Sequence, residues 1–325
     1  MLWYNKYMKC GDLMSKFVDA IIGHAVGDAM GVPSQFCLRK HLLKNPITEM
    51  VYSQKVGQPA GSWSDDTSME ICTTESYIEC GKFDYDDIMQ KWVNWITKGE
   101  YTPNGQTFDV GDTCLFAIRQ FSKGVEPLKC GLTTEYSNGN GSLMRILPVA
   151  LYSYYKKLSD KEIIKLTNDI SSLTHGHDIS KMACYIYIKY IGALLDGKTK
   201  EEAYDYIKTI DYSMYSEDAV ERYNRILKNN IKEYSINEIK SNCYVVDTLE
   251  CALWIFLNSK DYEETIIAST NIGNDTDTIG GIAGSMAGIV YGVDSIPKNW
   301  LNKLQKKDYL IDLALRYEEA INNQK

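Results

Sequence analysis

Two acidic segments, more than 200 residues apart, hold the side chains best suited to chemistry. The second, residues 274–278, combines Asp275 and Asp277 with the hydroxyls of Thr276 and Thr278. Side chains two positions apart diverge on a regular helix, so a turn or frayed helix start is the better interpretation. There the carboxylates can converge, and because they repel, they take up a proton or a cation. Oxygen ligands favour Mg²⁺, Mn²⁺ or Ca²⁺, although a plain helix cap uses the same residue types.

The first acidic segment places Ser64, Asp65 and Asp66 just before an apolar run. By itself it is more typical of a helix cap made by Ser64 than of a metal clamp. If the two segments meet, however, they supply four carboxylates and two hydroxyls, which is enough for two octahedral cations with open positions for water. Two such cations can stabilise the attacking and leaving oxygens of a hydrolysis.

Two further aspartates lie near predicted helix ends. Asp28 is a lone charge among the small residues of segment 23–31, so it needs a partner there, either as a buried hydrogen-bonding group or as a cap. Asp109 precedes a helix, and it would either cap that helix or point into a site.

A glycine-containing turn and a histidine pair are the remaining candidates. In the turn 138–142, Asn140, Gly141 and Ser142 precede an apolar segment, and backbone amides at such a helix start suit phosphate, although a plain turn is the alternative. His175 and His177 have no cysteine or third histidine nearby, so they do not indicate zinc. They would line a pocket or form hydrogen bonds within a loop.

The element that must position the second acidic segment is an uncharged run, residues 278–293. It is shorter than the roughly 20 apolar residues of a membrane span. Gly280, Gly284 and Gly288 share one helix face, and since each glycine costs roughly 1 kcal/mol relative to alanine, they predict the close approach of another backbone. We therefore expect a central buried helix whose N-terminal end, where the dipole favours anions, carries Asp275 and Asp277.

Helical periodicity runs through most of the chain. We find no proline-rich or glycine-rich linker, no low-complexity tract and no internal repeat, so the sequence predicts an all-α fold in a single domain, residues 1–325. The predicted helices include residues 13–30, 84–96, 179–195, 200–209, 216–229 and 244–257, one ending at 121 and one starting near 160. The C-terminal tail, residues 300–323, is amphipathic, and we expect it to close the bundle.

Composition limits the classes of partner. The 325-residue chain has a net charge of −8 and no basic stripe, which argues against a nucleic-acid binder. Its nine cysteines are scattered without a Cys-x-x-Cys pair, so a disulfide framework is not indicated and a reducing cytoplasm fits best. The N-terminus lacks the layout of a signal peptide. We expect a cytoplasmic monomer that does not enter a membrane.

Six motifs, taken together, resemble the ADP-ribosylglycohydrolase family. Any one of them would be weak, but they occur in the order of the family, cover residues 13 to about 295, and form a specific set. They are GHAVGDAMG (23–31), WSDDTSM (63–69), FDVG (108–111), GNGSLMRILPVAL (139–151), THGHD (174–178) and GNDTDTIGGIAGSMAGIVYG (273–292).

The resemblance implies a compact orthogonal helical bundle with two Mg²⁺ or Mn²⁺ ions in a cleft. The implied reaction is hydrolysis of the glycosidic bond between ADP-ribose and an acceptor, such as arginine or serine of a protein or a small molecule, through an oxocarbenium-like transition state. The metal ligands implied by the motifs are Ser64, Asp65, Asp66, Asp275, Asp277 and Thr278. The implied catalytic residues are Asp109, Asp66 and Asp275. The implied substrate-binding residues are Gln35, Asn140, Gly141, Ser142, His175, His177 and Gly273.

Two residues depart from the pattern of the family. Ser64 stands where many relatives have threonine, and it keeps the hydroxyl. Gln35 stands where many relatives carry glutamate, and glutamine cannot take up a proton at neutral pH. Either Asp109 then carries the proton transfer with a metal-bound water, or the enzyme is slow or altered in substrate range. The alternatives are an ADP-ribose-binding relative without catalysis and a metal-dependent nucleotide pyrophosphatase.

Overall fold

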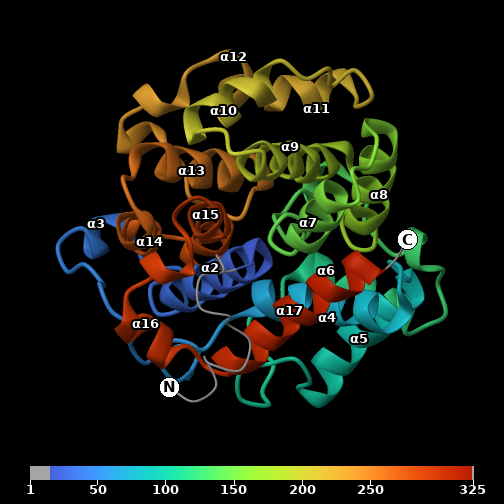
Figure 1. The fold of residues 1–325 in the computed structure, drawn as a ribbon, viewed down its shortest axis with the longest axis horizontal. Helices are drawn as coiled ribbons and strands as arrows, with labels where there is room; N and C mark the ends of the chain where they lie inside the picture. Colours follow the sequence, from blue (N-terminus) through green and yellow to red (C-terminus); the bar gives the residue numbers. More distant parts are fainter. Residues whose placement is uncertain (1–14, 324–325) are drawn as a thin grey trace.

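α-Helices make up the fold of residues 15–323, which are the residues that the computed structural model describes (Figure 1). Within this range there is no β-sheet, only isolated bridges, so the all-α prediction is confirmed. The α-helices are α2 (Lys16–Gly31), α3 (Arg39–Leu42), α4 (Asp65–Cys80), α5 (Tyr85–Lys98), α6 (Asp112–Phe121), α7 (Leu147–Tyr155), α8 (Asp160–Ser172), α9 (Asp178–Leu195), α10 (Lys200–Lys208), α11 (Glu217–Arg222), α12 (Asn224–Lys228), α13 (Val245–Asn258), α14 (Tyr262–Asn271), α15 (Thr276–Tyr291), α16 (Lys298–Lys303) and α17 (Lys307–Asn323).

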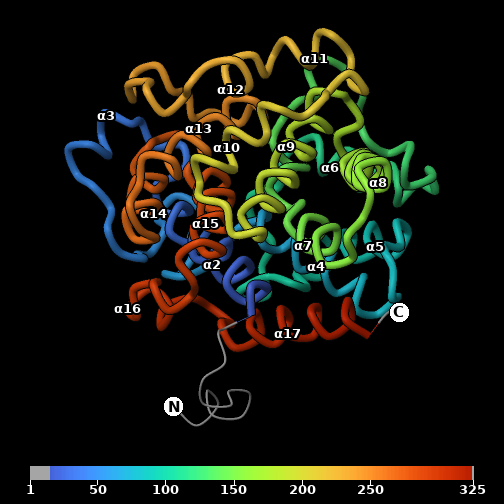
Figure 2. The backbone as a smooth tube through the Cα atoms, turned by 45° about the horizontal axis from the view of Figure 1, so that its top comes forward, coloured from blue at the N-terminus to red at the C-terminus, as the bar shows by residue number. Residues whose placement is uncertain are grey.

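Helix α15 is the central helix that its uncharged sequence predicts. It lies in the interior against α2 in both views (Figures 1 and 2), and its residues from Thr276 to Ile289 are all buried. Its glycine stripe meets the glycines of α2, because a Cβ added to Gly284 would lie 2.3 Å from the carbonyl oxygen of Gly23. The expected backbone approach is thus present. Burial of the larger apolar side chains of α15, at about 1.5–3 kcal/mol each, offsets the poor helix propensity of its glycines.

Local capping signals set several helix ends. Ser159 forms a complete capping box with Glu162 at the start of α8, close to the predicted position. Asp84 caps α5 by accepting from the backbone amide of Asp87. Gly99 ends α5 with a φ of 69°, a left-handed conformation that favours glycine. The predicted helix 13–30 begins at Lys16 in the structure, and Leu13 lies outside the described residues.

One predicted helix and the predicted amphipathic tail are each divided in the structure. The segment 216–229 forms α11 and α12, because Tyr223 between them is buried and donates its hydroxyl to the Ile179 carbonyl at 2.7 Å. The tail 300–323 forms α16 and α17, because the backbone amide of Gln305, which lies between them, donates to the Gly61 carbonyl and so interrupts the helix. Neither tertiary contact has a local sequence signal.

Helix α17 packs across α2 and α4 and runs along the lower edge of the molecule in Figure 2. Its Arg316 forms a two-pronged ion pair with Glu75 of α4, at 2.7 and 2.8 Å, and its Tyr309 donates to the same carboxylate. The amphipathic C-terminal tail therefore closes the bundle, as predicted. None of the helices within residues 15–323 combines the length and apolarity needed to cross a membrane.

Candidate metal centre and ligand pocket

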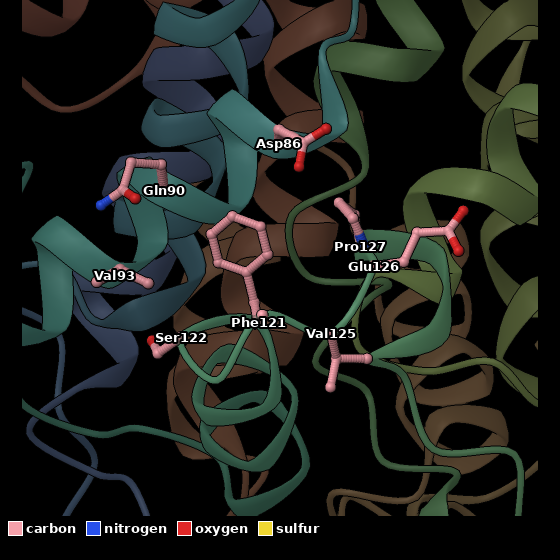
Figure 3. Close-up of a pocket in the computed structure, with 9 residues that line it drawn as sticks. Asp86, Gln90, Val93, Phe121, Ser122, Val125, Glu126 and Pro127 are labelled. Carbon is pink, nitrogen blue, oxygen red and sulfur yellow. The ribbon is translucent and has the colours of Figure 1, made fainter.

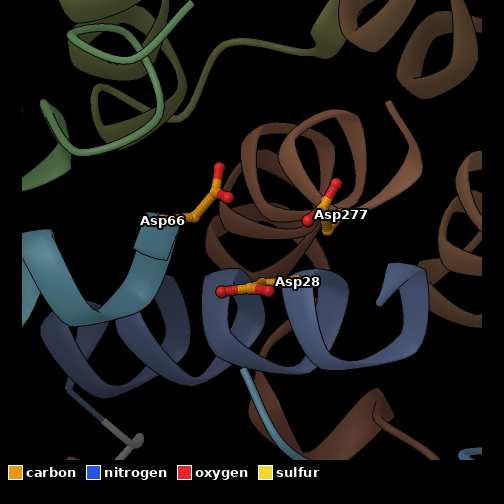
Figure 4. A group of neighbouring side chains, drawn as sticks. All are labelled: Asp28, Asp66 and Asp277. Atoms are coloured by element: carbon orange, nitrogen blue, oxygen red, sulfur yellow. The ribbon is translucent and has the colours of Figure 1, made fainter. Parts of the chain in front are cut away.

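Three aspartates from three helices meet beside the contact between α2 and α15 (Figure 4). They are Asp28 of α2, Asp66 of α4 and Asp277 of α15, and one carboxylate oxygen of each lies within 4.8 Å of those of the others. All three side chains are buried. The two acidic segments therefore meet in the folded protein, and Asp28 joins them.

Asp28 is saturated with hydrogen bonds from the start of α4. It accepts from the Ser64 amide at 2.9 Å, and from the amide and hydroxyl of Thr67 at 3.1 and 2.6 Å. Burial raises the pKa of Asp28 to about 6, while these hydrogen bonds oppose the shift. Asp28 thus fastens the acidic turn of α4 to α2, in agreement with its interpretation as a buried hydrogen-bonding group.

Asp66 and Asp277 are far less satisfied. Both oxygens of Asp277, and Oδ1 of Asp66, are buried without a hydrogen-bond partner among the described residues. The other oxygen of Asp66 accepts from the Ser64 hydroxyl at 2.7 Å. Burial, together with neighbouring carboxylates, holds the pKa of both aspartates well above the usual range. Buried carboxylate oxygens without partners are costly, and a set of oxygens alone fits Mg²⁺ or Mn²⁺.

Ser64 combines the two roles that its sequence leaves open. It is the N-cap residue of α4 and accepts from the Asp66 amide at 3.4 Å, while its hydroxyl donates to the carboxylate of the same residue. The cap interpretation and a position beside the aspartates are therefore compatible.

A pocket of about 300 Å³ opens next to the three aspartates. Asp65 and Thr278, the chain neighbours of Asp66 and Asp277, lie on its wall, and so does Asp275, two residues before Asp277. Asn140 donates to Asp275, and burial raises the pKa of Asp275 to about 6 against this hydrogen bond. The other predicted site residues on the wall are Gln35, Asp109, Asn140, Gly141 and His175.

Three predicted substrate-binding residues are not among the lining residues of the pocket. Ser142 is fully buried and accepts from the Ser171 hydroxyl at 3.1 Å. His177 caps α9, where its Nδ1 accepts from the Ile179 amide at 3.3 Å. Gly273 has a φ of 85°, and a Cβ there would lie 2.6 Å from the Arg39 amide nitrogen. The structure thus gives each of them a contact within the protein and places none of them on the wall of this pocket.

The rim of the pocket contains strained backbone. Phe36, Asp109 and Asn274 have φ values of 57°, 53° and 61°, in the left-handed region that residues other than glycine seldom adopt. The Phe36 amide donates to the Asn274 carbonyl at 2.5 Å, and Gln35 Nε2 donates to Asp109 Oδ2. Strain held in place by such contacts is typical of functional sites.

Arg39 is a structural residue of the site that sequence reasoning missed. Its guanidinium donates to the carbonyl oxygens of Ile272, Ile236 and Ile239, at 2.6, 2.5 and 2.8 Å, so it holds the chain that leads into Asp275. These partners lie 197 to 233 residues away in sequence, so no local signal exists.

Arg145 was also missed, although a signal was present. It is a lone charge in the apolar segment 143–151, which is the criterion that singled out Asp28. The structure buries it completely behind the pocket.

A larger hollow, of about 590 Å³, lies between α5 and the segment after α6 (Figure 3). The ring of Phe121 stands among its lining side chains, and its carboxylates, Asp86 and Glu126, are both exposed. Exposed carboxylates keep their hydration and have little need of a cation. The three buried aspartates are therefore the better candidate for a cation site than this hollow.

Comparisons with known proteins agree with this geometry. The family model of the ADP-ribosylglycohydrolases matches residues 10–325. ADP-ribosylarginine hydrolase Tri1 of Serratia proteamaculans is 32% identical over 302 residues, which cover 93% of this chain and 78% of that protein. ADP-ribosyl-[dinitrogen reductase] glycohydrolase of Rhodospirillum rubrum is 29% identical over 302 residues, covering 89% of this chain and 90% of that protein.

A solved structure described as an ADP-ribosylglycohydrolase-related protein complex has the same fold. It matches with a TM-score of 0.77 at 26% identity, over 94% of this chain and 98% of that chain. A family match over nearly the whole chain, a shared fold and the meeting of the acidic motifs all point the same way: the chain belongs to the ADP-ribosylglycohydrolase family.

Proposed function

We propose that this protein is a metal-dependent hydrolase that cleaves the glycosidic bond between ADP-ribose and an acceptor, and so reverses ADP-ribosylation. Arginine is the first acceptor to test, because a relative at 32% identity is named as a hydrolase of ADP-ribosylarginine. The observation that best supports the proposal is that three of the four carboxylate oxygens of the buried Asp66 and Asp277 have no hydrogen-bond partner within residues 15–323, beside a pocket of about 300 Å³. We further propose that residues 1–325 act as one domain, and as a cytoplasmic monomer.

The metal would be held by the side chains at the two helix starts. We propose two Mg²⁺ or Mn²⁺ ions, with ligands drawn from Ser64, Asp65, Asp66, Asp275, Asp277 and Thr278. Bound ions of this kind stabilise developing negative charge and lower the pKa of water. They would also allow Asp66 and Asp277 to remain ionised in their buried positions.

Residues of the pocket wall would bind ADP-ribose and accept the proton of the attacking water. Asp109 would accept a proton from the attacking water, oriented by the hydrogen bond that its Oδ2 accepts from Gln35. Asn140 would orient Asp275 through the hydrogen bond that it donates. Gly141 and His175 would contact the ligand, while Ser142, His177 and Gly273 would hold the backbone behind them.

The experiment that tests this function uses metal-stripped protein with Mg²⁺ or Mn²⁺ added back. ADP-ribosyl-arginine and ADP-ribosyl-serine are supplied, and free ADP-ribose is measured. We expect metal-dependent release that is lost in Asp66→Asn and Asp277→Asn. Asp205→Asn, at a side chain that is 77% exposed on α10, is the matched control and should retain activity. Release of AMP from ADP-ribose itself would indicate a pyrophosphatase instead.

A binding protein without catalysis is the second candidate, and Gln35 is the observation that favours it. Its amide donates to Asp109 and cannot exchange a proton at neutral pH. Metal-dependent binding of ADP-ribose without release from either acceptor would support this candidate and contradict the hydrolase.

A further inference from the structure

A chain of buried polar contacts runs from Arg145 to the pocket wall. Nη2 of Arg145 donates to Oγ1 of Thr174 at 2.7 Å, and the same oxygen lies 2.7 Å from Nδ1 of His175. Arg145 and Thr174 are 0% exposed and His175 is 2% exposed. Of the three, His175 alone lies on the pocket wall. Arg145 is therefore connected to the pocket wall through Thr174 and His175.

The positions of the hydrogens follow from what each group can donate. A guanidinium only donates, so Thr174 Oγ1 accepts from Arg145 through a lone pair, and its own hydrogen remains available for His175 Nδ1. The Cys114 thiol is the competing acceptor near Oγ1, and sulfur is a much weaker acceptor than an imidazole nitrogen. Nδ1 therefore accepts the hydrogen of Thr174.

The charge state of His175 completes the assignment. Burial, with a contribution from the positive charge of Arg145, lowers the pKa of His175 to about 3, so the ring is neutral and carries one hydrogen. Because the guanidinium lies on the Nδ1 side, its charge disfavours an N–H at that atom. The hydrogen is consequently on Nε2.

Nε2 lies beside the glycine turn that forms part of the pocket wall. A Cβ added to Gly139 would lie 3.6 Å from Nε2, and one added to Gly141 would lie 3.5 Å from Nε2 and 2.9 Å from Cε1. Any larger residue at Gly141 would collide with the ring. The turn thus leaves room for His175 next to the pocket, where a donor suits an oxygen of a ligand.

Arg145 is an expensive residue to bury for packing alone. Its Nε and Nη1 have no hydrogen-bond partner within residues 15–323. Its guanidinium lies 4.4 Å from the centre of the Trp92 ring, a cation–π contact that offsets part of the cost of burial. A buried cation that uses so few of its donors points to a role in the site that it faces.

We propose that Arg145 and Thr174 are positioning residues that hold His175 in the Nε2–H tautomer, so that His175 donates a hydrogen bond to an oxygen of the bound ligand. The tautomer follows from the contacts of this chain, whereas the identity of the ligand as ADP-ribose rests on the proposed function.

Nitrogen-15 NMR of the histidine-labelled full chain at pH 7 tests the tautomer directly. The chain has four histidines, so His175→Gln assigns the signal. The wild type should show an unprotonated Nδ1 at His175. Thr174→Val removes the hydroxyl at nearly constant volume and should give a mixture of tautomers. Thr174→Ser should restore the wild-type signal. Arg145→Met should also give a mixture, and the threonine variants keep the test decisive if that variant does not fold.

The affinity for ADP-ribose, measured by calorimetry with Mg²⁺ or Mn²⁺, is the second readout. Loss of one oriented donor should weaken binding on the order of tenfold in Thr174→Val, with recovery in Thr174→Ser. Thr167→Val is the matched control, because Thr167 is equally buried and its hydroxyl has no partner in the described part of the chain. It should change neither the tautomer nor the affinity.

The outcomes separate this proposal from the proposed function. A wild-type His175 with its hydrogen on Nδ1, or an unchanged Nε2–H signal in Thr174→Val, overturns the positioning role. The other case is a wild type that carries the hydrogen on Nε2 and a Thr174→Val variant that loses this tautomer, in a protein that binds no ADP-ribose with either metal. This result leaves the positioning role standing and overturns the proposed function.

Discussion

Gly27 of α2 and Gly280 of α15 face each other so closely that neither could carry a side chain. A Cβ on Gly27 would lie 2.0 Å from the carbonyl oxygen of Gly280, and a Cβ on Gly280 would lie 2.4 Å from that of Gly27. Asp28 directly follows Gly27, and Asp277 lies one helical turn before Gly280. The approach of the two backbones therefore sets the separation of two carboxylates in the candidate metal centre.

Gly27→Ala should destabilise the protein. The added methyl group meets backbone rather than a movable side chain, so α2 and α15 must separate, at a cost of about 1–3 kcal/mol or more. Urea unfolding measures the loss. Gly192→Ala in α9 is the control, since a Cβ there has no atom within 4 Å and should stabilise the helix by about 0.5–1 kcal/mol. A similar change in both variants would contradict this account of the glycine contact.

The sequence predicted one side of this contact but not the contact itself. The stripe Gly280–Gly284–Gly288 is visible because residues four apart share a helix face. Its pairing with Gly23 and Gly27 is a tertiary relation that no local pattern encodes. The same limit explains the division of segment 216–229, where the buried hydroxyl of Tyr223 binds a carbonyl of α9.

The candidate site was likewise predictable by residue type but not by role. The spacing of Asp275 and Asp277 predicted that the two carboxylates could converge, whereas the structure places Asp277 in the group with Asp28 and Asp66, and Asp275 on the pocket wall. The spacing did not indicate that Asp28 would be saturated by donors from α4 while Asp277 would have none among residues 15–323, since the donors to Asp28 come from a distant part of the chain. The structural role of Arg39 could not be predicted for the same reason.

Asp277→Asn should have opposite effects on stability with and without metal. Without metal, the variant removes a buried carboxylate that has no hydrogen-bond partner in the described part of the chain, so its melting temperature should exceed that of the wild type. With metal at 100 times the dissociation constant, the wild type should gain about 2.7 kcal/mol, and the variant should gain little. Differential scanning fluorimetry with Mg²⁺ or Mn²⁺ measures both effects. An equal metal-induced gain in Asp277→Asn and in the exposed control Asp205→Asn would rule out Asp277 as a ligand.

The stabilisation by metal should increase with pH. The pKa values of Asp28 and Asp275 are raised to about 6 in the folded protein. In the unfolded chain both ionise near pH 4, so their contribution to stability is full below pH 4 and is lost as the pH rises through 6. Without metal, each should lower stability by roughly 2 kcal/mol at pH 8 relative to pH 4.

Bound cations favour the ionised carboxylates, so they should remove much of this penalty. The gain from Mg²⁺ in urea unfolding should therefore be larger at pH 8 than at pH 6.5. An equal stabilisation by Mg²⁺ at the two pH values would mean that these aspartates lie too far from the cation for its charge to affect their ionisation.

His24 should have the opposite effect on stability: its contribution to the free energy of unfolding should decrease as the pH falls below 6.5. It is buried near Glu70, with Nε2 3.4 Å from a carboxylate oxygen, and burial lowers its pKa to about 3. The unfolded chain protonates this histidine near pH 6.5, so its contribution is present above pH 6.5 and is lost as the pH falls toward 3. The loss should reach roughly 2 kcal/mol at pH 5.

His24→Gln should reduce this acid sensitivity, while the same change at the exposed His41 should leave it intact. Urea unfolding between pH 7 and pH 5 measures the difference in slope. Parallel slopes for His24→Gln and the wild type would show that His24 takes up its proton in the folded state.

Gln35→Glu should change the pH dependence of catalysis. It replaces the amide that donates to Asp109 with a carboxylate, and two carboxylates in contact share a proton. One member of the pair should then titrate closer to neutral pH, so the rate of ADP-ribose release should gain a new pH-dependent limb, and the preference between arginine and serine acceptors should shift. Gln90→Glu, which adds the same charge at an exposed position on α5, is the control. Identical pH–rate profiles for Gln35→Glu and the wild type on both acceptors would show that this position takes no part in proton transfer, and that the glutamine is no obstacle to the activity.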